Sequence, residues 1–367
     1  MIPWAQPNID KHELNAVIKV FKSDRFTMGN HVKLFEEKMS SYCEAKYALA
    51  VSNGTVALDI ALKAIGIKAG DEVIVPAVTY FSSASSVSYQ NATPVFVDID
   101  INNFSIDPNK IEKAITKKTK AIIYIDYGGI PADYQKIKKI ANKHKLVIIN
   151  DAAQSLGSSV DNKRLGCLGD ISTMSFHMAK ILTTVEGGMI FTNNKKLYSK
   201  VQTLRNIGEP INFKYNHHLI GTNARMTEIS AAMGLEQIKK LNFFIKKRNE
   251  IANLYIKKIK EFDLSVSLPK LNKTTKYSYF FFPILISNRD FIARKLKDIY
   301  KVDTRIAYPM PIYQQKVYSD KVSFYKKKQC PVSEQFCNQI LNLPIYPSLK
   351  HKDVIFIVES LKELMKK

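Results

Sequence analysis

Lys180 stands in a segment whose residue types suit a lysine that reacts with a carbonyl group. Ser175-Phe176-His177 precedes it, and hydroxyl side chains and the turn Glu186-Gly187-Gly188 follow it. An uncharged lysine amine can attack a carbonyl carbon and form a Schiff base. Burial and neighbouring positive charge favour this by lowering the lysine pKa. The setting predicts a Schiff-base site for pyridoxal phosphate, whereas most other lysines of the chain are expected to be solvated surface groups.

Asp151 is the candidate partner for the ring nitrogen of that coenzyme. Pyridoxal phosphate acts as an electron sink only while this nitrogen is protonated, which requires a buried carboxylate beside it. Asp151 comes directly after the apolar segment 146–150. The competing interpretation is a helix N-cap for the residues that follow. Gln154 is a candidate donor to the coenzyme's phenolic oxygen, or else an amide that anchors a loop.

The remaining parts of such a site are a phosphate cradle and an aromatic platform. Gly54 and Thr55 open a predicted helix, where backbone N–H groups and a hydroxyl can bind a phosphate. Ser175 offers a second hydroxyl, and Tyr80 is placed to stack on the coenzyme ring. Each signal is weak alone, because helices commonly begin with Ser or Thr and because aromatic residues are more often part of the core.

The composition is that of a folded protein with room for two domains. The chain has 367 residues, of which 46% are hydrophobic and 10% aromatic. No apolar run approaches the roughly 20 residues that span a bilayer, and the start does not resemble a signal peptide. We therefore expect a cytoplasmic protein without membrane insertion. The four cysteines show no metal-ligand spacing, so we assign no metal and no disulfide.

The formal net charge of +22 could indicate nucleic acid, a membrane surface or an anionic small molecule. The basic residues are scattered as pairs, and Lys326-Lys327-Lys328 is a short run without interleaved aromatic residues. We therefore expect a solvated surface and no nucleic-acid partner, with some steering of a phosphorylated substrate as the alternative.

The first 200 residues alternate apolar segments with amphipathic helical ones, which predicts α/β architecture with a mostly parallel sheet flanked by helices. Strands are predicted at 48–51, 72–76, 94–97, 121–125, 146–150 and 171–174, and helices at 55–66, 80–89, 109–116 and 133–144. In such sheets ligands bind at the carboxyl ends of the strands, where the candidate residues fall.

The pattern changes after about residue 225. Residues 226–262 read as one long helix, followed by an aromatic-rich strand at 277–286, a helix at 289–300, a proline-rich loop at 309–311 and two terminal helices. We predict a large coenzyme-binding domain with an N-terminal arm over residues 1–245 and a smaller C-terminal α/β domain over 246–367.

Together these motifs closely resemble the DegT/DnrJ/EryC1/StrS family, the pyridoxal phosphate-dependent sugar aminotransferases of fold type I, in the aspartate aminotransferase superfamily. The resemblance spans nearly the whole chain. It rests on Asn53-Gly54-Thr55, Asp151-Ala152-Ala153-Gln154, Ser175-Phe176-His177-x-x-Lys180, Glu186-Gly187-Gly188 and Gly221-x-Asn223-x-Arg225-Met226, with Phe35-Glu36, Pro94-Val95-Phe96-Val97-Asp98, Tyr308-Pro309-x-Pro311 and Leu343-Pro344-x-Tyr346-Pro347.

The resemblance implies roles for individual residues. Lys180 would carry the coenzyme, Asp151 would contact its pyridinium nitrogen, and Gln154 would lie near its hydroxyl. Tyr80 would stack on the ring, and Thr55 and Ser175 would bind the phosphate. Asn223 would reach the phosphate of the neighbouring subunit's coenzyme, which implies a homodimer with shared active sites. Relatives with histidine in place of the lysine are dehydratases, so Lys180 favours transamination.

The sequence departs from the family pattern at three positions. Asp126 stands where many relatives have histidine, Ala224 replaces an aromatic residue, and Tyr313 replaces a common histidine near the sugar site. Candidates for substrate contacts are His177, Glu186, Tyr308 and Tyr313. The loops 25–31, 207–222 and 308–315 are expected to select the sugar.

We therefore expect an aminotransferase that moves an amino group from L-glutamate, through pyridoxamine phosphate, onto a ketone of a nucleotide-diphosphate sugar. The product would serve a surface polysaccharide or glycoconjugate. A 4-keto-6-deoxy sugar is the first choice and a 3-keto sugar the second. Alternatives are a cyclitol or a small phosphorylated ketone as substrate, and a non-catalytic regulatory or interaction protein on the same fold.

Overall fold

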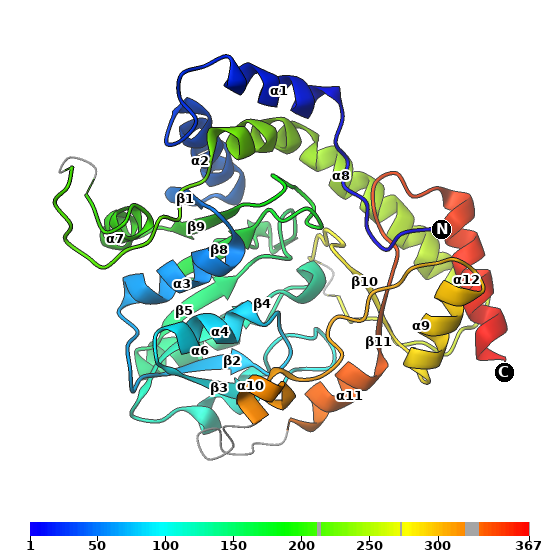
Figure 1. Cartoon of the computed structure of the whole chain (residues 1–367). Helices are drawn as coiled ribbons and strands as arrows, with labels where there is room; N and C mark the ends of the chain where they lie inside the picture. The colour runs from blue at the N-terminus through cyan, green and yellow to red at the C-terminus, as the bar shows by residue number, and fades with distance from the viewer. Residues whose placement is uncertain (211–213, 272–273, 320–329, 367) are drawn as a thin grey trace.

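A seven-stranded sheet forms the centre of the computed structural model, which describes residues 1–210, 214–271, 274–319 and 330–366. Its strands are β1 (Tyr47–Val51), β2 (Glu72–Pro76), β3 (Thr93–Val97), β4 (Thr119–Ile125), β5 (Val147–Asp151), β8 (Ile171–Ser175) and β9 (Gly188–Thr192). They lie in the order β1-β9-β8-β5-β4-β2-β3 (Figure 1). Six of these strands run in the same direction, and β9 runs opposite to them. The predicted mostly parallel sheet is confirmed.

Both faces of this sheet are covered by helices, as the near-continuous apolar strands require. Ile123 and Ile149 point to a cluster shared with α3, whereas the neighbouring Ile122 and Ile148 point to one shared with α6. The helices of this part are α1 (Lys11–Phe21), α2 (Asn30–Cys43), α3 (Gly54–Ile65), α4 (Ser82–Tyr89), α5 (Pro108–Ile111), α6 (Tyr134–His144) and α7 (Lys195–Arg205). In the described residues, no helix is long and apolar enough to cross a membrane.

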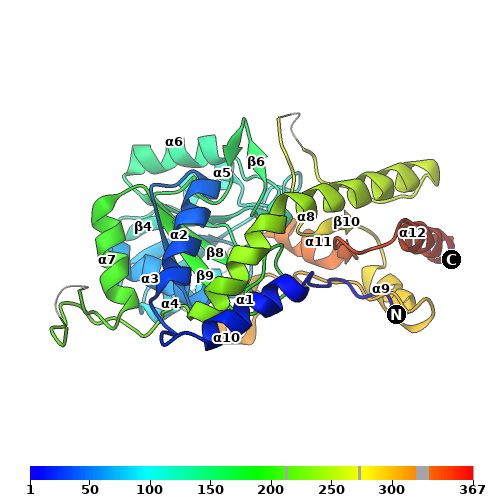
Figure 2. The ribbon, with the colours of Figure 1, turned by 90° about the horizontal axis from the view of Figure 1, so that it is seen from above.

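A second group of elements follows the long helix α8 (Glu228–Glu261). These elements are β10 (Phe282–Leu285), α9 (Arg289–Asp298), α10 (Lys316–Ser319), α11 (Pro331–Gln339), β11 (Ile340–Leu343) and α12 (His351–Met365). The helix α8 packs on α1 and α2 and also on α12, so it runs through both parts (Figures 1 and 2). We propose that the boundary between the two predicted domains lies inside α8, near residue 245.

The first residues of the chain lie against the C-terminal part rather than against the central sheet. Ile2 forms a parallel bridge with Val302, and the ring of Trp4 lies under the Arg305 guanidinium at 5.5 Å. The N-terminal arm therefore connects the two parts of the molecule. The predicted basic run Lys326-Lys327-Lys328 lies outside the described residues, as do residues 211–213 of the predicted sugar loop 207–222.

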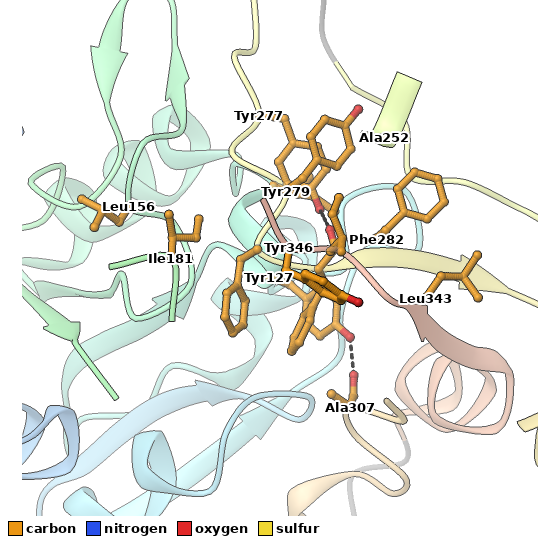
Figure 3. Packing of buried hydrophobic residues seen from close by; sticks show 14 of the residues in the cluster. Tyr127, Leu156, Ile181, Ala252, Tyr277, Tyr279, Phe282, Ala307, Leu343 and Tyr346 are labelled. Atoms are coloured by element: carbon orange, nitrogen blue, oxygen red, sulfur yellow. Dashed lines mark hydrogen bonds between the residues drawn. The ribbon is translucent and has the colours of Figure 1, made fainter. Parts of the chain in front are cut away.

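The predicted aromatic strand at 277–286 is shorter than expected, because β10 begins only at Phe282. Before it, Tyr279 has a left-handed backbone (φ 51°), and the N–H of Phe280 donates to the Gly128 carbonyl at 3.0 Å. These residues bond to loops of the large domain instead of to a strand. Figure 3 shows Tyr277, Tyr279 and Phe282 grouped next to Ala252 of α8 in the buried core.

Asp98, which follows β3, joins the sheet to the C-terminal part. Its buried carboxylate accepts hydrogen bonds from the Ser333 N–H (2.7 Å) and hydroxyl (2.6 Å) and from the Val332 N–H (3.2 Å), all in the first turn of α11. Lys110 adds an ammonium group at 2.9 Å. Burial acts to raise the pKa of Asp98, but the bonds from Lys110 and Ser333 outweigh it and hold the pKa below its ordinary value.

Replacing Asp98 by asparagine is expected to lower the free energy of unfolding by about 2 kcal/mol, since charge-assisted hydrogen bonds to a buried group are lost. Because the folded-state pKa is depressed, this stabilisation is present above about pH 4 and is lost as the pH falls through the folded value. Urea denaturation at pH 7 and at several pH values below 4 measures both effects. The exposed pair of Glu261 with Lys258 provides the control, because Glu261→Gln should change stability little. An equal loss in both variants would contradict the prediction.

Candidate active site

The predicted site residues converge at the carboxyl edge of the sheet. Asp151 ends β5 and Ser175 ends β8, while Gly54 and Thr55 begin α3 directly after β1. The chain leaves β2 through Tyr80 into α4. Parallel strands present their carboxyl ends to the same side, so these segments meet although they are far apart in sequence.

Lys180 lies partly buried in the loop between β8 and β9. The ammonium nitrogen is 4.7 Å from the centre of the Phe280 ring, which comes from the other part of the molecule. Burial lowers the pKa of Lys180 to about 8, although the Asp151 carboxylate acts to raise it. A larger fraction of this amine is therefore neutral, and able to attack a carbonyl, than of an ordinary surface lysine.

Phe280 is held in place by a buried arginine of α8. The Arg248 guanidinium donates to the carbonyl of Tyr279 at 2.9 Å and to that of Ile345 at 3.0 Å. Burial lowers the pKa of Arg248 to about 10. This arginine ties the segment that carries Phe280 to α8, so the wall beside Lys180 depends on contacts between both parts of the chain.

The lowered pKa of Lys180 predicts how the apoprotein reacts with pyridoxal phosphate as the pH changes. The neutral amine reacts, and it forms by loss of a proton, so a pKa of about 8 instead of 10.5 makes the amine half neutral near pH 8. The rate at which the Schiff-base absorption band appears should rise with pH and level off above about pH 8. A rate that continues to rise through pH 10 would indicate an ordinary lysine.

Asp151 is buried, and its carboxylate is held by Ser83 of α4, a residue that the sequence analysis did not single out. The Ser83 hydroxyl, on α4, donates to Oδ2 at 2.7 Å, and the hydroxyl of Thr79 lies 2.8 Å from that of Ser83. Burial raises the pKa of Asp151, while the bond from Ser83 and the charge of Lys180 lower it. The alternative role as a helix N-cap lacks support, because Asp151 is followed by turns and then by the short strand β6 (Ser159–Val160), and no helix begins directly after it.

The predicted phosphate cradle is a close crossing of backbone segments. A Cβ atom on Gly54 would lie 2.8 Å from the Cβ of Ser175, and one on Gly188 would lie 2.5 Å from the backbone of Asn53. Both glycines are therefore needed for this approach. Thr55 and Ser82, at the starts of α3 and α4, bond to each other through their hydroxyls at 2.6 Å. The first turn of α3, next to Ser175, offers N–H groups to an anion.

Gln154 is fixed in one orientation. Its Oε1 accepts from the N–H of Gly128 at 2.7 Å, and its Nε2 donates to the Tyr308 hydroxyl at 2.9 Å. A backbone N–H can only donate, so the amide cannot be flipped, and one Nε2 hydrogen remains for a further acceptor. The ring of Tyr80 lies 6.3 Å from that of Tyr308 and is 60% exposed, so one face is open to a ligand.

The four predicted substrate contacts differ in how they lie relative to the site. His177 and Glu186 are exposed near Lys180, with Nε2 and Oε1 3.8 Å apart. Tyr308 lies in the site, where its hydroxyl accepts a hydrogen bond from the Gln154 amide. Tyr313 instead bonds to the Glu334 carboxylate and packs against Phe96, so its assignment to the substrate stays a prediction.

Asn223, the predicted contact to the neighbouring subunit, is exposed in a bridge with Asn206. Ala224, one of the departures from the family pattern, is buried in the cluster shared with α3. The residues that the structure describes leave Asn223 exposed, so its side chain is open to another molecule as far as they extend.

Asp126, another departure from the family pattern, is a second buried carboxylate near Asp151. Its oxygens accept from the Ala132 N–H at 3.0 Å and from the Asn150 amide at 3.1 Å. Burial raises the pKa of Asp126 to about 6, while these two bonds lower it. Its contacts close the turn that contains Gly128, so it supports Gln154 indirectly.

Sequence reasoning missed Ser83, Thr79, Ser82 and Phe280. The run Thr79-Tyr80-Phe81-Ser82-Ser83 directly follows a predicted strand and was read only for its tyrosine. The spacing of four between Thr79 and Ser83 places both hydroxyls on one side of the helix start, which is a signal that could have been used. Phe280 had no such signal, because only the tertiary structure brings it to Lys180.

The chemistry of the residues at this site fits pyridoxal phosphate. Four groups lie at one edge of the sheet: a lysine with a lowered pKa, a buried carboxylate that a hydroxyl holds in place, an amide with a spare donor, and a tight helix start next to a serine. These are the groups needed for the aldehyde, the ring nitrogen, the phenolic oxygen and the phosphate of the coenzyme.

Comparison with known proteins gives an independent result. The model of the DegT/DnrJ/EryC1/StrS aminotransferase family matches residues 7–362. The chain is 38% identical to a GDP-perosamine synthase from Escherichia coli O157:H7, over 99% of this chain and 98% of the relative. It is 36% identical to a dTDP-3-amino-3,6-dideoxy-alpha-D-galactopyranose transaminase from Aneurinibacillus thermoaerophilus, over 94% and 93%. Among solved structures, NtdA from Bacillus subtilis with bound cofactor PMP superposes with a TM-score of 0.89 at 34% identity, over 97% of this chain and 82% of that one.

Proposed function

Because the chain belongs to the DegT/DnrJ/EryC1/StrS aminotransferase family, we propose that it transfers an amino group from L-glutamate to a ketone of a nucleotide-diphosphate sugar. The observation that carries the proposal is the Lys180 amine, whose pKa burial lowers to about 8, at the same sheet edge as the buried carboxylate of Asp151. The family membership confirms the predicted fold class and the predicted class of enzyme, a pyridoxal phosphate-dependent aminotransferase. A cytoplasmic location remains part of the proposal.

The substrate class is supported by the names of the relatives. The relative from E. coli is named for a GDP-linked sugar and that from A. thermoaerophilus for a dTDP-linked one, so both nucleotides are candidates here. A 4-keto-6-deoxy sugar is the first choice. A 3-keto sugar is the second candidate, favoured by the 3-amino product in the name of the A. thermoaerophilus relative. The product would serve amino-sugar biosynthesis for a surface polysaccharide.

Pyridoxal phosphate supplies an electron sink for the electron pair left when the carbon that bears the amino group loses its proton. Asp151 supports this by holding a proton on the ring nitrogen, since an anionic carboxylate in a buried site stabilises a neighbouring cation strongly. Gln154 would donate its spare Nε2 hydrogen to the phenolic oxygen. Thr55, Ser175 and the first turn of α3 would bind the phosphate.

Lys180 has two tasks in sequence. Its neutral amine would hold the coenzyme by bonding to the carbonyl carbon with loss of water. When the amine is free, it would act as the base that moves the proton of the substrate carbon. Phe280 lies beside this amine, whose burial lowers its pKa. Tyr80 would stack on the ring and restrict its orientation.

The test is an amine-transfer assay with the purified protein, pyridoxal phosphate and L-glutamate. The acceptors are GDP- and dTDP-linked 4-keto-6-deoxy and 3-keto sugars, with a cyclitol ketone and a small phosphorylated ketone as comparison. We expect turnover with one nucleotide sugar and little with the unlinked ketones. Turnover only with a ketone that lacks a nucleotide would overturn the substrate class. Failure to bind pyridoxal phosphate at all would overturn the enzyme assignment.

We further propose that the protein works as a homodimer in which Asn223 of one copy completes the site of the other. The exposed position of Asn223 supports this. So do large apolar side chains exposed in the neighbouring loops: Met178 (50%), Val185 (56%) and Ile220 (94%). A second copy that covers them would remove apolar surface from water.

Mixing two defective variants tests the shared site. Lys180→Ala lacks the reactive amine, and Asn223→Asp places a carboxylate where a phosphate is expected. In a mixed dimer, the Lys180 of one copy faces the intact Asn223 of the other, so one complete site forms. Activity that appears on co-refolding the two variants supports the proposal. A mixture as inactive as its components, from a protein that light scattering shows to be dimeric, would contradict it.

A further inference from the structure

The hydroxyls of Thr79 and Ser83 form a buried chain that ends on the carboxylate of Asp151. Both side chains are almost fully buried, with exposed fractions of 2% and 0%. The Thr79 and Ser83 oxygens are 2.8 Å apart, and Ser83 Oγ lies 2.7 Å from Asp151 Oδ2. The chain reaches Asp151 from α4, whereas Asp151 itself ends β5.

The chemistry of the three groups determines the direction of both hydrogen bonds. An ionised carboxylate only accepts, so the Ser83 hydroxyl must donate to Asp151. The Ser83 oxygen then remains as an acceptor for the Thr79 hydroxyl. A donor that is itself hydrogen-bonded in this way is a stronger donor. The chain therefore favours the ionised carboxylate over the protonated one.

We propose that Ser83, supported by Thr79, is a positioning residue that keeps the Asp151 carboxylate ionised and oriented toward the ring nitrogen of the cofactor. This inference rests on the proposed use of pyridoxal phosphate. Ser83 does not touch the cofactor in this role. It acts through Asp151.

Burial is the largest influence on Asp151 and acts against its ionised form. Lys180 is the neighbouring cation that favours the ionised form, and the Asp151 carboxylate acts in turn to raise the pKa of its titratable neighbours Asp126 and Tyr308. The positive charge of Lys180 is lost once its amine becomes neutral and reacts. The donors from Ser83, at 2.7 Å, and from the Ala153 N–H, at 3.3 Å, remain and oppose the effect of burial, and the bond from Ser83 is the shorter one.

The start of α4 thus supports both ends of the cofactor site. Ser82 bonds to Thr55 in the phosphate cradle, and Ser83 bonds to Asp151. Tyr80, the proposed stacking residue, directly precedes them. One short segment therefore sets the distance between the phosphate end and the ring-nitrogen end.

The experiment compares Ser83→Ala, Ser83→Thr and Thr79→Val with Ser86→Ala. Ser86 is a matched control, because it is buried on the same helix and its hydroxyl makes a long bond of 3.5 Å to the Thr55 carbonyl. Each protein is loaded with pyridoxal phosphate that carries ¹⁵N at the ring nitrogen, whose NMR shift reports ring protonation. The rate of the half-reaction with L-glutamate is followed by absorbance, without any sugar.

Without Ser83 the proton is expected to move from the ring nitrogen toward Asp151. Ser83→Ala should therefore shift the ¹⁵N signal toward the unprotonated value and slow the half-reaction about tenfold, the effect of one hydrogen bond to a charged group. Ser83→Thr should restore both, and Ser86→Ala should resemble the wild type. Thr79→Val should change both in the same direction by about two- to threefold, and it carries the test if Ser83→Ala does not fold.

A wild-type ¹⁵N shift and rate in Ser83→Ala, with only thermal stability reduced, would overturn the inference. So would a failure of Ser83→Thr to restore the ring proton. The readouts are separate from the proposed substrate: if the wild type binds the cofactor but aminates no nucleotide sugar, the substrate proposal fails, while the ¹⁵N shifts still decide the role of Ser83.

Discussion

Replacing Lys180 with alanine is expected to reduce amine transfer by at least about 10⁴-fold, the upper range of a single acid–base group. The variant loses both the amine that reacts with the carbonyl and the group that moves the proton. The expected signature is a purified protein without the Schiff-base absorption band, even with added pyridoxal phosphate. Steady-state kinetics and an absorption spectrum measure both effects.

Two controls separate the chemistry of Lys180 from its charge. Lys180→Arg keeps the positive charge, but its guanidinium stays protonated and cannot attack a carbonyl, so it should be as inactive as the alanine variant. Lys239→Ala removes an exposed lysine of α8 that pairs with Glu236, and it should behave as the wild type. Substantial activity in Lys180→Arg would mean that the site needs a cation and not a reactive amine.

Replacing Asp151 with asparagine is expected to lower the turnover number by about 10²–10³-fold, as for the loss of one preorganised electrostatic group. The substitution keeps the size of the side chain and removes the charge that holds a proton on the ring nitrogen. The Schiff-base band should still form, because Lys180 is intact. This combination of bound cofactor and slow turnover distinguishes Asp151 from Lys180.

The matched control is the second buried carboxylate at this edge. Asp126→Asn places an amide among the N–H donors of Ala132 and Asn150, so it should reduce stability more than turnover. Urea denaturation and initial rates on both variants measure the two effects. If Asp126→Asn lost as much turnover as Asp151→Asn, ring protonation could not be assigned to Asp151 alone.

The Lys180, Asp151 and Asp98 variants test residues with different roles in the molecule. In the proposed mechanism Lys180 and Asp151 act in the reaction, while Ser83, Gln154 and Phe280 set the state and orientation of these groups. Asp98 links the sheet to α11, on the side where Tyr313 bonds to Glu334. Changes at residues outside the reacting groups, such as Asp98 and Tyr313, are expected to act on stability or on substrate selection before they act on the reaction itself.

The sequence by itself determined the strands of the sheet and indicated the candidate reactive residues. The apolar segments at 72–76, 121–125 and 146–150 became β2, β4 and β5 within a residue or two, because a strand buried on both faces needs an unbroken apolar run. Asp151 is a candidate for a related reason, because an ionisable side chain at the end of such a run is costly unless it has a task. Lys180 is a candidate because of the residue types around it.

Only the tertiary structure decided which distant groups lie against Lys180 and Asp151. Ser83 lies 68 positions from Asp151 in the sequence, and Phe280 reaches Lys180 from beyond α8. The segment before Phe282 was predicted as a strand from its aromatic residues, but its N–H groups bond to loops near Gly128 and Ser158. Local patterns reflect burial along one element, whereas these contacts depend on how separate elements pack, which periodicity does not encode.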